Sequence, residues 1–216
     1  PSGEITNYPL LRFLAKNYKK IILSTGMSSL KEIKWAIKIL QKYKIKRSNI
    51  TILHCTSSYP APIEELNLNV IKYLKKKFKA NVGYSDHSNS ILTPIIASTM
   101  GASMIEKHFT LNKKFKGPDH SSSIDEHEFS KVIKGIKLSN IMMGSFKKEC
   151  TKSEYRNKKI VRKSIYASRK IQKGEKFSDK NLITLRPDVG ISANFWEKII
   201  GKKAKKNFKK LDLIIV

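Results

Sequence analysis

The chain has 216 residues, of which 40% are hydrophobic, and its 44 Lys and Arg against 17 Asp and Glu give a formal net charge of +27. There is enough apolar material for a folded core. There is no apolar run of about 18 residues and no charged-then-apolar leader, so we expect a globular protein without a membrane span or signal peptide. The cysteines, Cys55 and Cys150, cannot form a disulfide framework, which predicts a cytoplasmic location.

The positive charge is spread along the chain. Residues 1–150 contain 25 Lys and Arg against 11 Asp and Glu, and residues 151–216 contain 19 against 6. Only six of the 44 cations are Arg, whereas Arg is the residue that favours bidentate contacts to bases and phosphates. We therefore expect no specific nucleic-acid partner. A basic, non-catalytic binding protein is the rival prediction from another class of function.

Short apolar runs alternate with amphipathic stretches in the first 145 residues, which is typical of strand-then-helix units. The first helix is predicted to start at the capping box Ser29–Glu32, and the third to end near Gly101. The predicted apolar stripes are Leu30, Ile33, Ile37 and Leu40 in the first helix and Leu66, Val70, Leu74 and Phe78 in the second. The predicted strands are residues 21–26, 50–55, 81–85 and 103–109. They begin about 20–30 residues apart, as βαβ crossovers require, which predicts an α/β fold: half of an eight-stranded barrel or a short open sheet.

The pattern changes after residue 143, where the first predicted domain (1–143) ends. Residues 144–159 lack apolar periodicity and are predicted to form a linker. Residues 160–216 contain short strand-like pieces separated by turns, with one helical turn near Phe195. This last segment is predicted to be a small, mostly β domain.

Polar residues gather where the predicted strands end. Active sites of barrels and doubly wound sheets are built at this edge. Strand alternation turns Ser85 and His87 to one side, and Glu106 and His108 likewise, so imidazoles from adjacent strands can converge. Such a pair suits a catalytic divalent ion, with Asp119 supplying a carboxylate nearby, and the alternative is a structural role for each histidine. The polar residues at or just past strand ends are Ser24, Ser57, Tyr59, Ser85, His87 and His108.

Several motifs follow one another in a fixed order. They are PSGEITNYPL (residues 1–10), STGM (24–27), HCTSSYP (54–60), GYSDHS (83–88), EKHFT (106–110) and GPDH (117–120). In order and spacing they resemble the barrel of sialic acid (N-acetylneuraminate) synthases. Residues 185–191 resemble the marker of the antifreeze-protein-like (SAF) module that ends that family. The resemblance covers nearly the whole chain and implies the C-terminal half of a (β/α)8 TIM barrel followed by a SAF domain.

The resemblance also implies an activity. Members of that family are transferases that condense phosphoenolpyruvate with N-acetylmannosamine or a related N-acyl amino sugar, giving a sialic acid and phosphate. They bind a divalent ion, usually Mn²⁺ with Mg²⁺ or Co²⁺ as alternatives, through residues that match His87 and His108. Legionaminic and pseudaminic acid synthases are sister enzymes that differ in the sugar, and the GPDH motif favours the sialic or legionaminic branch.

Further site residues are implied by position. Residues matching Ser2, Ser24, Ser57 and Ser85 line the phosphoenolpyruvate pocket in that family. Residues matching Glu4, Tyr59 and Asp119 contact the reacting groups or the amino sugar. The arginine that matches Arg186 reaches over the N-acyl group from the small domain of a partner subunit, which implies a domain-swapped homodimer.

The resemblance leaves the earlier barrel strands of the family, including a phosphate-binding lysine, without a counterpart. A half barrel exposes strand edges and an open core face. We therefore expect this chain to be inactive by itself, and a non-catalytic remnant is a further alternative.

Overall fold

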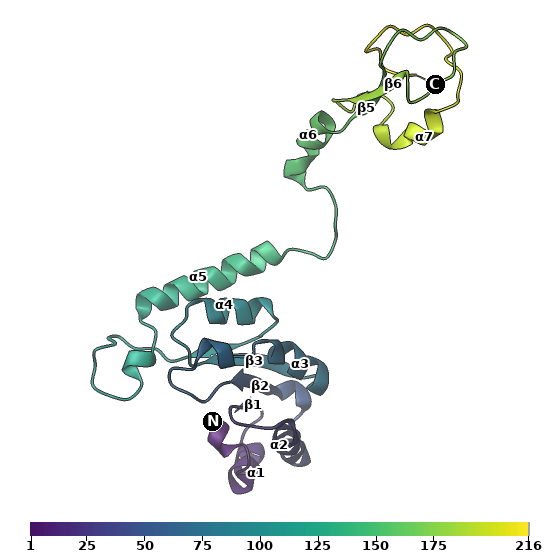
Figure 1. Ribbon diagram of the computed structural model, residues 1–216. Helices are drawn as coiled ribbons and strands as arrows, with labels where there is room; N and C mark the ends of the chain where they lie inside the picture. The colour runs from purple at the N-terminus through teal and green to yellow at the C-terminus, as the bar shows by residue number, and fades with distance from the viewer. Residues whose placement is uncertain (216) are drawn as a thin grey trace. The chain divides into compact units, whose positions relative to one another are not determined.

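The computed structural model describes residues 1–215 and forms two compact units, residues 1–145 (unit 1) and residues 146–216 (unit 2) (Figure 1). The predicted domain boundary at residue 143 lies close to this division. None of the helices within residues 1–215 is long and apolar enough to cross a membrane.

Unit 1 is built on one parallel sheet. Its strands are β1 (Ile21–Ser24), β2 (Ile50–Cys55), β3 (Asn81–Asp86) and β4 (Ile105–Lys107), and their order in the sheet is β1-β2-β3-β4. Sheet order therefore follows chain order, as successive βαβ crossovers of one hand produce. The prediction of an α/β half barrel is confirmed.

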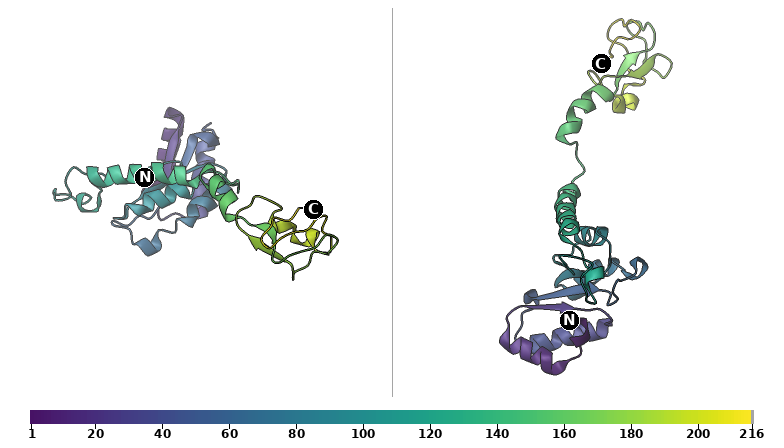
Figure 2. Two further views of the ribbon diagram at one scale, coloured as in Figure 1. Left: turned by 90° about the horizontal axis from the view of Figure 1, so that it is seen from above. Right: turned by 90° about the vertical axis from the view of Figure 1, so that its left-hand side faces the viewer.

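Helices connect the strands and cover one face of the sheet. The helices are α1 (Tyr8–Asn17), α2 (Leu30–Lys42), α3 (Asn69–Phe78), α4 (Leu92–Thr99) and α5 (Glu126–Met143), with short 3-10 turns η1 (Ser2–Glu4), η2 (Arg47–Asn49), η3 (Ile63–Glu65) and η4 (His120–Ser122). In Figures 1 and 2, α5 lies alongside α4. The capping box before α2 is confirmed, because the Glu32 N–H donates to Ser29 Oγ at 3.3 Å and the Ser29 N–H donates to Glu32 Oε2 at 2.7 Å.

The core of unit 1 lies between the sheet and these helices. In α2, Ile33, Ile37 and Leu40 are buried as predicted, but Leu30 at the first turn is 39% exposed. In α3, Leu74 and Phe78 are buried as predicted and Val70 is half-buried against the core, while Ile71, which the predicted stripe lacks, is fully buried. Ile71 precedes Leu74 and Phe78 by three and seven residues, so it lies on the same helical face as they do. The strands contribute Ile21, Leu23, Ile50, Ile52, Val82 and Tyr84 to this core.

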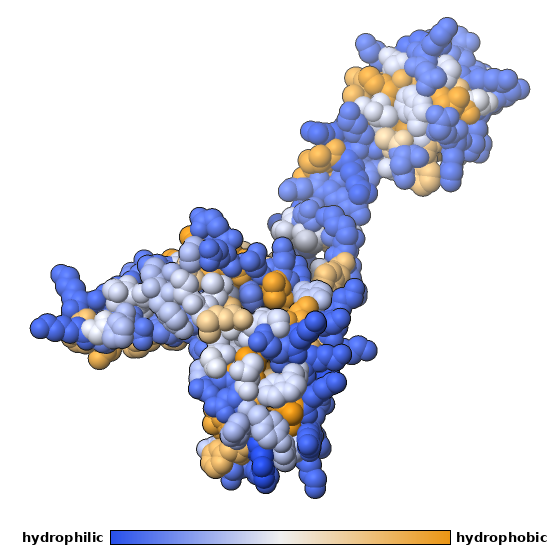
Figure 3. All heavy atoms as spheres, turned by 60° about the horizontal axis from the view of Figure 1, so that its bottom comes forward, coloured by the Kyte–Doolittle hydropathy of each residue, from blue (hydrophilic) through white to orange (hydrophobic). Residues whose placement is uncertain are grey.

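The other face of the sheet is the concave side of the half barrel. Alternate strand residues turn to it, and of its apolar members Ile22 and Met104 are 52% and 37% exposed, whereas Leu53 is fully buried. Gly83 allows β3 and β4 to approach, because a Cβ there would lie 2.7 Å from the backbone oxygen of Met104. In the face of the molecule that Figure 3 shows, hydrophilic residues cover most of the surface and apolar residues form scattered patches.

Unit 2 is small and rich in irregular structure. Its elements are α6 (Lys152–Val161), β5 (Ser164–Ala167), β6 (Leu182–Leu185), η5 (Ala193–Phe195) and α7 (Trp196–Ile199), and β5 pairs antiparallel with β6. The side chains of Ile165, Ile171, Phe177 and Phe208 form the centre of a separate core. Helix α6 occupies the second half of the predicted linker. It contains no buried residue, so hydrophobic periodicity gives no signal for it.

Candidate active site

A polar cavity of about 350 Å³ opens on the concave face, where the strands of unit 1 end. The predicted gathering of polar residues at this edge is therefore present in the structure. Its lining consists of Pro1, Ser2, Ile22, Ser24, Cys55, Tyr59, Ser85, His87, Glu106 and His108.

The imidazole of His87 is held from two sides. Its Nδ1 lies 2.7 Å from the backbone oxygen of Thr56, and because a carbonyl only accepts, Nδ1 carries the hydrogen of the neutral ring. Its Nε2 lies 3.3 Å from Ser85 Oγ, but that hydroxyl donates over a shorter distance, 2.7 Å, to Glu106 Oε1. The Nε2 lone pair of neutral His87 is therefore free to accept a ligand or a proton.

The second imidazole lies beside the first. The ring centroids of His87 and His108 are 5.4 Å apart and the rings are inclined at 72°. Asp119 Oδ2 lies 4.0 Å from His108 Nδ1. Strand alternation predicted this convergence, and the structure brings the three side chains together. Their roles in catalysis and metal binding stay predictions.

Tyr59 lies over both histidines. Its ring centroid is 4.3 Å from that of His87 and 5.4 Å from that of His108. Partial burial raises the pKa of the Tyr59 phenol most, and the carboxylates of Asp119 and Glu106 raise this pKa further. The phenol therefore keeps its hydrogen at neutral pH and can donate it to a substrate oxygen.

The hydroxyl of Ser2 joins the first residues of the chain to the end of β1. Ser2 Oγ accepts the Gly26 N–H at 2.9 Å and lies 3.3 Å from Cys55 Sγ. Ser57 also lies here, since a Cβ on Gly26 would overlap its Oγ. The absence of a side chain at Gly26 thus lets the two serines and the thiol meet beside the cavity.

Four predicted site residues are not part of the cavity lining: Ser57 and Asp119, which were described above, and Glu4 and Arg186. Glu4 is outside the cavity lining, and its Oε2 accepts a hydrogen bond of 2.6 Å from Asn7 Nδ2. Arg186 belongs to unit 2, where it is exposed and directly follows β6. The predicted contacts of both residues with substrate remain predictions.

Sequence reasoning did not propose Cys55 or Ile22 as lining residues, and it noted Glu106 only for its direction. Ile22 and Ser24 in β1, and Leu53 and Cys55 in β2, share a strand face. Both lining residues therefore alternate with the core residues of their strands. That alternation is the signal that could have found them.

The two histidines fit an open metal site. Within residues 1–215, no group of three or more His, Cys, Asp or Glu is arranged to hold an ion. A metal-ligating histidine commonly donates its other ring N–H to a carbonyl, as His87 does to Thr56, and this leaves Nε2 as the donor atom. His87 and His108 could therefore hold a divalent ion whose other positions are filled by water or substrate oxygens.

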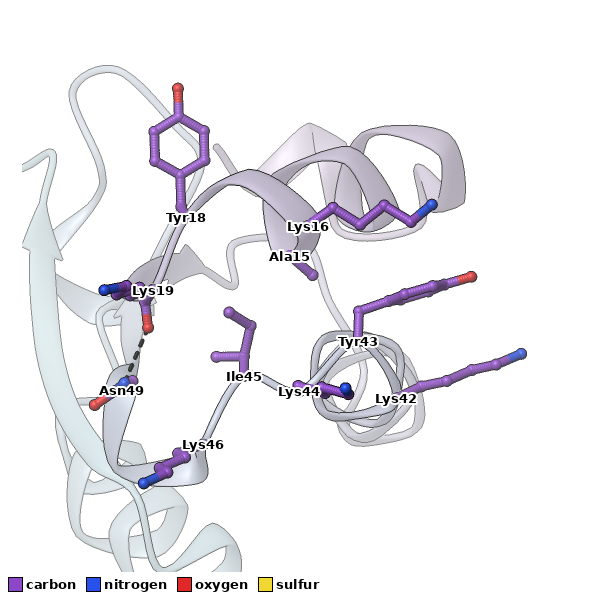
Figure 4. Close-up of a pocket in the computed structure, with 10 residues that line it drawn as sticks. All are labelled: Ala15, Lys16, Tyr18, Lys19, Lys42, Tyr43, Lys44, Ile45, Lys46 and Asn49. Atoms are coloured by element: carbon purple, nitrogen blue, oxygen red, sulfur yellow. Dashed lines mark hydrogen bonds between the residues drawn. The ribbon is translucent and has the colours of Figure 1, made fainter.

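A larger cavity, of about 670 Å³, lies at the opposite end of the strands. Figure 4 shows its lysines: Lys16 and Lys42 extend to one side and Lys46 to the other, so their ammonium groups do not converge on one ligand position. Lys16 and Lys42 lie in the last turns of α1 and α2, where cations offset the negative end of a helix dipole. A structural role accounts for them. The lining residues are Ala15, Lys16, Tyr18, Lys19, Lys42, Tyr43, Lys44, Ile45, Lys46 and Asn49.

Comparison with known proteins identifies relatives over the whole chain. Residues 1–148 match the NeuB family and residues 162–214 match the SAF domain. The chain is 50% identical to the N,N'-diacetyllegionaminic acid synthase of Campylobacter jejuni, over 99% of this chain and 64% of that protein. It is 37% identical to the pseudaminic acid synthase of the same species, over 96% of this chain and 60% of that protein.

A solved structure shows the same architecture. The N-acetylneuraminic acid synthetase of Leptospira borgpetersenii superposes with a TM-score of 0.65 and 36% identity, over 72% of this chain and 54% of that one. The chain thus spans less than two thirds of the length of each of these relatives.

Proposed function

The chain belongs to the NeuB family, and on this basis we propose that it forms part of a synthase that condenses phosphoenolpyruvate with an N-acyl amino sugar, giving a nonulosonic acid and phosphate. The observation that supports this most is the meeting of His87, His108 and Tyr59 at a hydroxyl-lined cavity on the carboxyl edge of a parallel sheet. A barrel enzyme of this kind carries its chemistry at that edge.

The reaction joins carbon 3 of the enol to the aldehyde carbon of the sugar. Water then adds to the cationic carbon that is left, and the tetrahedral product loses phosphate by cleavage of the C–O bond and a proton from the added hydroxyl. The negative charge that develops on the aldehyde oxygen must be stabilised. His87 Nε2 and His108 would hold a divalent ion, proposed to be Mn²⁺, with Mg²⁺ or Co²⁺ as alternatives, whose chemistry when bound is Lewis-acid polarisation of a carbonyl oxygen.

The other lining residues bind and move protons. The neutral phenol of Tyr59 donates a hydrogen bond to the aldehyde oxygen as it becomes an alkoxide. The hydroxyls of Ser2 and Ser24 donate to oxygens of phosphoenolpyruvate. The Glu106 carboxylate, which already accepts a hydrogen bond from Ser85, takes the proton of the attacking water.

The cavity lacks one component that this substrate needs. Phosphoenolpyruvate is a trianion, yet the lining contains the carboxyl group of Glu106 and no Lys or Arg. The proposed divalent ion would be engaged with the aldehyde oxygen, and a phosphate held against a carboxylate without a further cation is strongly disfavoured. The remaining third of the relatives' length would have to supply the cations, so we propose that this chain alone does not turn over.

The identity of the acceptor sugar is a finer part of the proposal. The 50% identical relative acts in the synthesis of N,N'-diacetyllegionaminic acid, so we place the precursor amino sugar of that acid first and N-acetylmannosamine second. The pseudaminic acid precursor ranks third because the GPDH motif at residues 117–120 favours the sialic or legionaminic branch, since identity does not separate the pseudaminic (37%) from the sialic (36%) relative. A domain-swapped homodimer, with Arg186 reaching the sugar in a partner subunit, and a cytoplasmic location belong to the same proposal.

Phosphate release tests the proposal. The purified chain would be assayed with phosphoenolpyruvate, Mn²⁺ and each of the three sugars. The assay would be repeated after the chain is co-expressed with the part of the Campylobacter jejuni N,N'-diacetyllegionaminic acid synthase that it does not cover. We expect turnover only in the co-expressed sample, and its loss in His87→Ala and His108→Ala. Robust turnover by the chain alone would refute its predicted inactivity. Retention on nucleic acid that is lost at high salt, without any effect of Mn²⁺, would instead favour the basic binding protein.

A further inference from the structure

One buried ion pair lies on the helix-covered face of the sheet. Lys107 Nζ is 2.7 Å from Asp86 Oδ2, and the two side chains are 4% and 0% exposed. In the three other ion pairs found within residues 1–215, each side chain is at least 27% exposed. Of these four ion pairs, Asp86–Lys107 is therefore the one that the fold removes from water.

Each member of the pair immediately precedes one of the two histidines in the sequence. Asp86 precedes His87 and Lys107 precedes His108, and Asp86 and Lys107 are register partners between β3 and β4. Successive strand residues point to opposite faces of a sheet. The ion pair therefore lies on one face, and the two imidazoles that follow it lie on the other, where their centroids are 5.4 Å apart.

The same two side chains also hold the segment that carries His87. Asp86 Oδ1 accepts the Ser88 N–H at 2.9 Å, and Lys107 Nζ donates to the Ser88 backbone oxygen at 2.6 Å. His87 thus stands between two residues that are both tied to Lys107. This matters because β4 spans only Ile105–Lys107 and pairs with β3 through three residues, so its backbone ladder is short.

A gain in folding stability does not by itself explain why such a buried ion pair is present. Removing two charges from water costs several kcal/mol per ion, and replacing a buried pair by apolar residues of similar volume is often neutral or stabilising. What a buried, hydrogen-bonded pair does supply is one defined geometry.

We propose that Asp86 and Lys107 are positioning residues that fix β3 against β4, so that His87 and His108 meet at the distance the site requires. The pair touches no reacting atom and acts through the two imidazoles. The inference rests on the proposed function for its purpose, but its geometric content does not depend on the reaction.

The test variant is Asp86→Asn/Lys107→Met in the full 216-residue chain. It leaves no lone charge in the core, and the carbonyl oxygen of the amide that Asp86→Asn introduces can still accept the Ser88 N–H. The chain contains five histidines, so selective labelling gives a simple imidazole spectrum. We expect His87 to keep its Nδ1–H form, since Thr56 is untouched, while the ring-to-ring cross-peak between His87 and His108 is lost.

A second readout is Mn²⁺ affinity, measured by calorimetry. Loss of groups that orient metal ligands typically weakens metal binding about 10–100-fold, and we expect a decrease of at least about tenfold. Lys107→Arg alone, which keeps the cation, should retain both signals. The matched control is Lys113→Met/Glu128→Gln, which removes an exposed ion pair of the same unit and should change neither readout.

The outcomes separate the two proposals. A folded variant that keeps the cross-peak and the wild-type Mn²⁺ affinity would overturn the positioning role, whatever the enzyme does. If Mn²⁺ binds neither protein but the cross-peak is lost, the positioning role holds and the proposed function is weakened. Should the first variant fail to fold, Asp86→Asn/Lys107→Gln, which retains polar partners, replaces it, and an unchanged cross-peak there would refute the inference equally.

Discussion

Gly83 offers a direct test of how closely β3 and β4 approach. A Cβ added at this position would lie 2.5 Å from Leu53 Cδ2, 2.7 Å from the Met104 backbone oxygen and 3.0 Å from Met104 Cβ. A leucine methyl can rotate, but the Met104 oxygen accepts the Tyr84 N–H at 2.9 Å and belongs to the backbone that leads into β4. Gly83→Ala must therefore push β4 away from β3.

The expected cost follows from overpacking. Inserting a methyl group into a packed interior typically destabilises a protein by about 1–3 kcal/mol. For a chain of this size each 1 kcal/mol lowers the melting temperature by about 2–4 °C, which gives a decrease of roughly 2–12 °C for the transition of unit 1. The same displacement moves His108 away from His87, so the Mn²⁺ affinity should fall as well.

Thermal unfolding followed by circular dichroism measures the effect. Gly3→Ala is the matched control, because a Cβ at Gly3 would meet nothing within 4 Å, and it should melt with the wild-type chain. If Gly83→Ala also melts within about 1 °C of wild type, well inside the range expected from overpacking, the two strands are not in the close contact described here.

Three further changes have defined outcomes. Tyr59→Phe removes the proposed donor to the developing alkoxide and should lower the phosphate-release kcat of the co-expressed enzyme about 10²-fold, with little change in melting temperature. Phe177→Ala should destabilise unit 2 by about 3–5 kcal/mol in a denaturant titration and leave the transition of unit 1 in place, because Phe177 is 1% exposed in a separate core. Glu175→Gln should lower the melting temperature of unit 2 at pH 7 but not near pH 2. Hydrogen bonds from Arg169, the Gln172 N–H and Asn181 lower the pKa of Glu175 from 4.5 to about 2, so its contribution is present above pH 4.5 and is lost as pH falls toward 2.

Local sequence signals located much of unit 1. The capping box at Ser29 was visible because it needs only four residues, and the strands were visible because apolar runs alternate with helical stripes. The meeting of His87 and His108 also followed from alternation, since neighbouring parallel strands turn equivalent residues to one face.

Other features depend on contacts between distant segments. Nothing local in the sequence shows that Asp86 and Lys107 are buried partners, because their burial exists only once β4 has paired with β3 and the helices cover that face. Ile71 was missed because the predicted stripe was counted in steps of four from Leu66, which lies before the helix start at Asn69. Helix α6 has no buried residue, so hydrophobic periodicity could not find it.

The placement of charge is the reason for proposing that turnover needs residues from outside the cavity lining. The net charge of +27 attracts an anionic substrate from many directions, but long-range attraction raises encounter rates and does not orient a phosphate. Lys107 belongs to a site strand, yet its ammonium lies behind the sheet and is committed to Asp86 and the Ser88 carbonyl. The cavity itself offers hydroxyls, two imidazoles and a carboxyl group. A partner segment that restores turnover should therefore bring at least one Lys or Arg to this cavity, and a segment in which those cations are neutralised should assemble with the chain without restoring phosphate release.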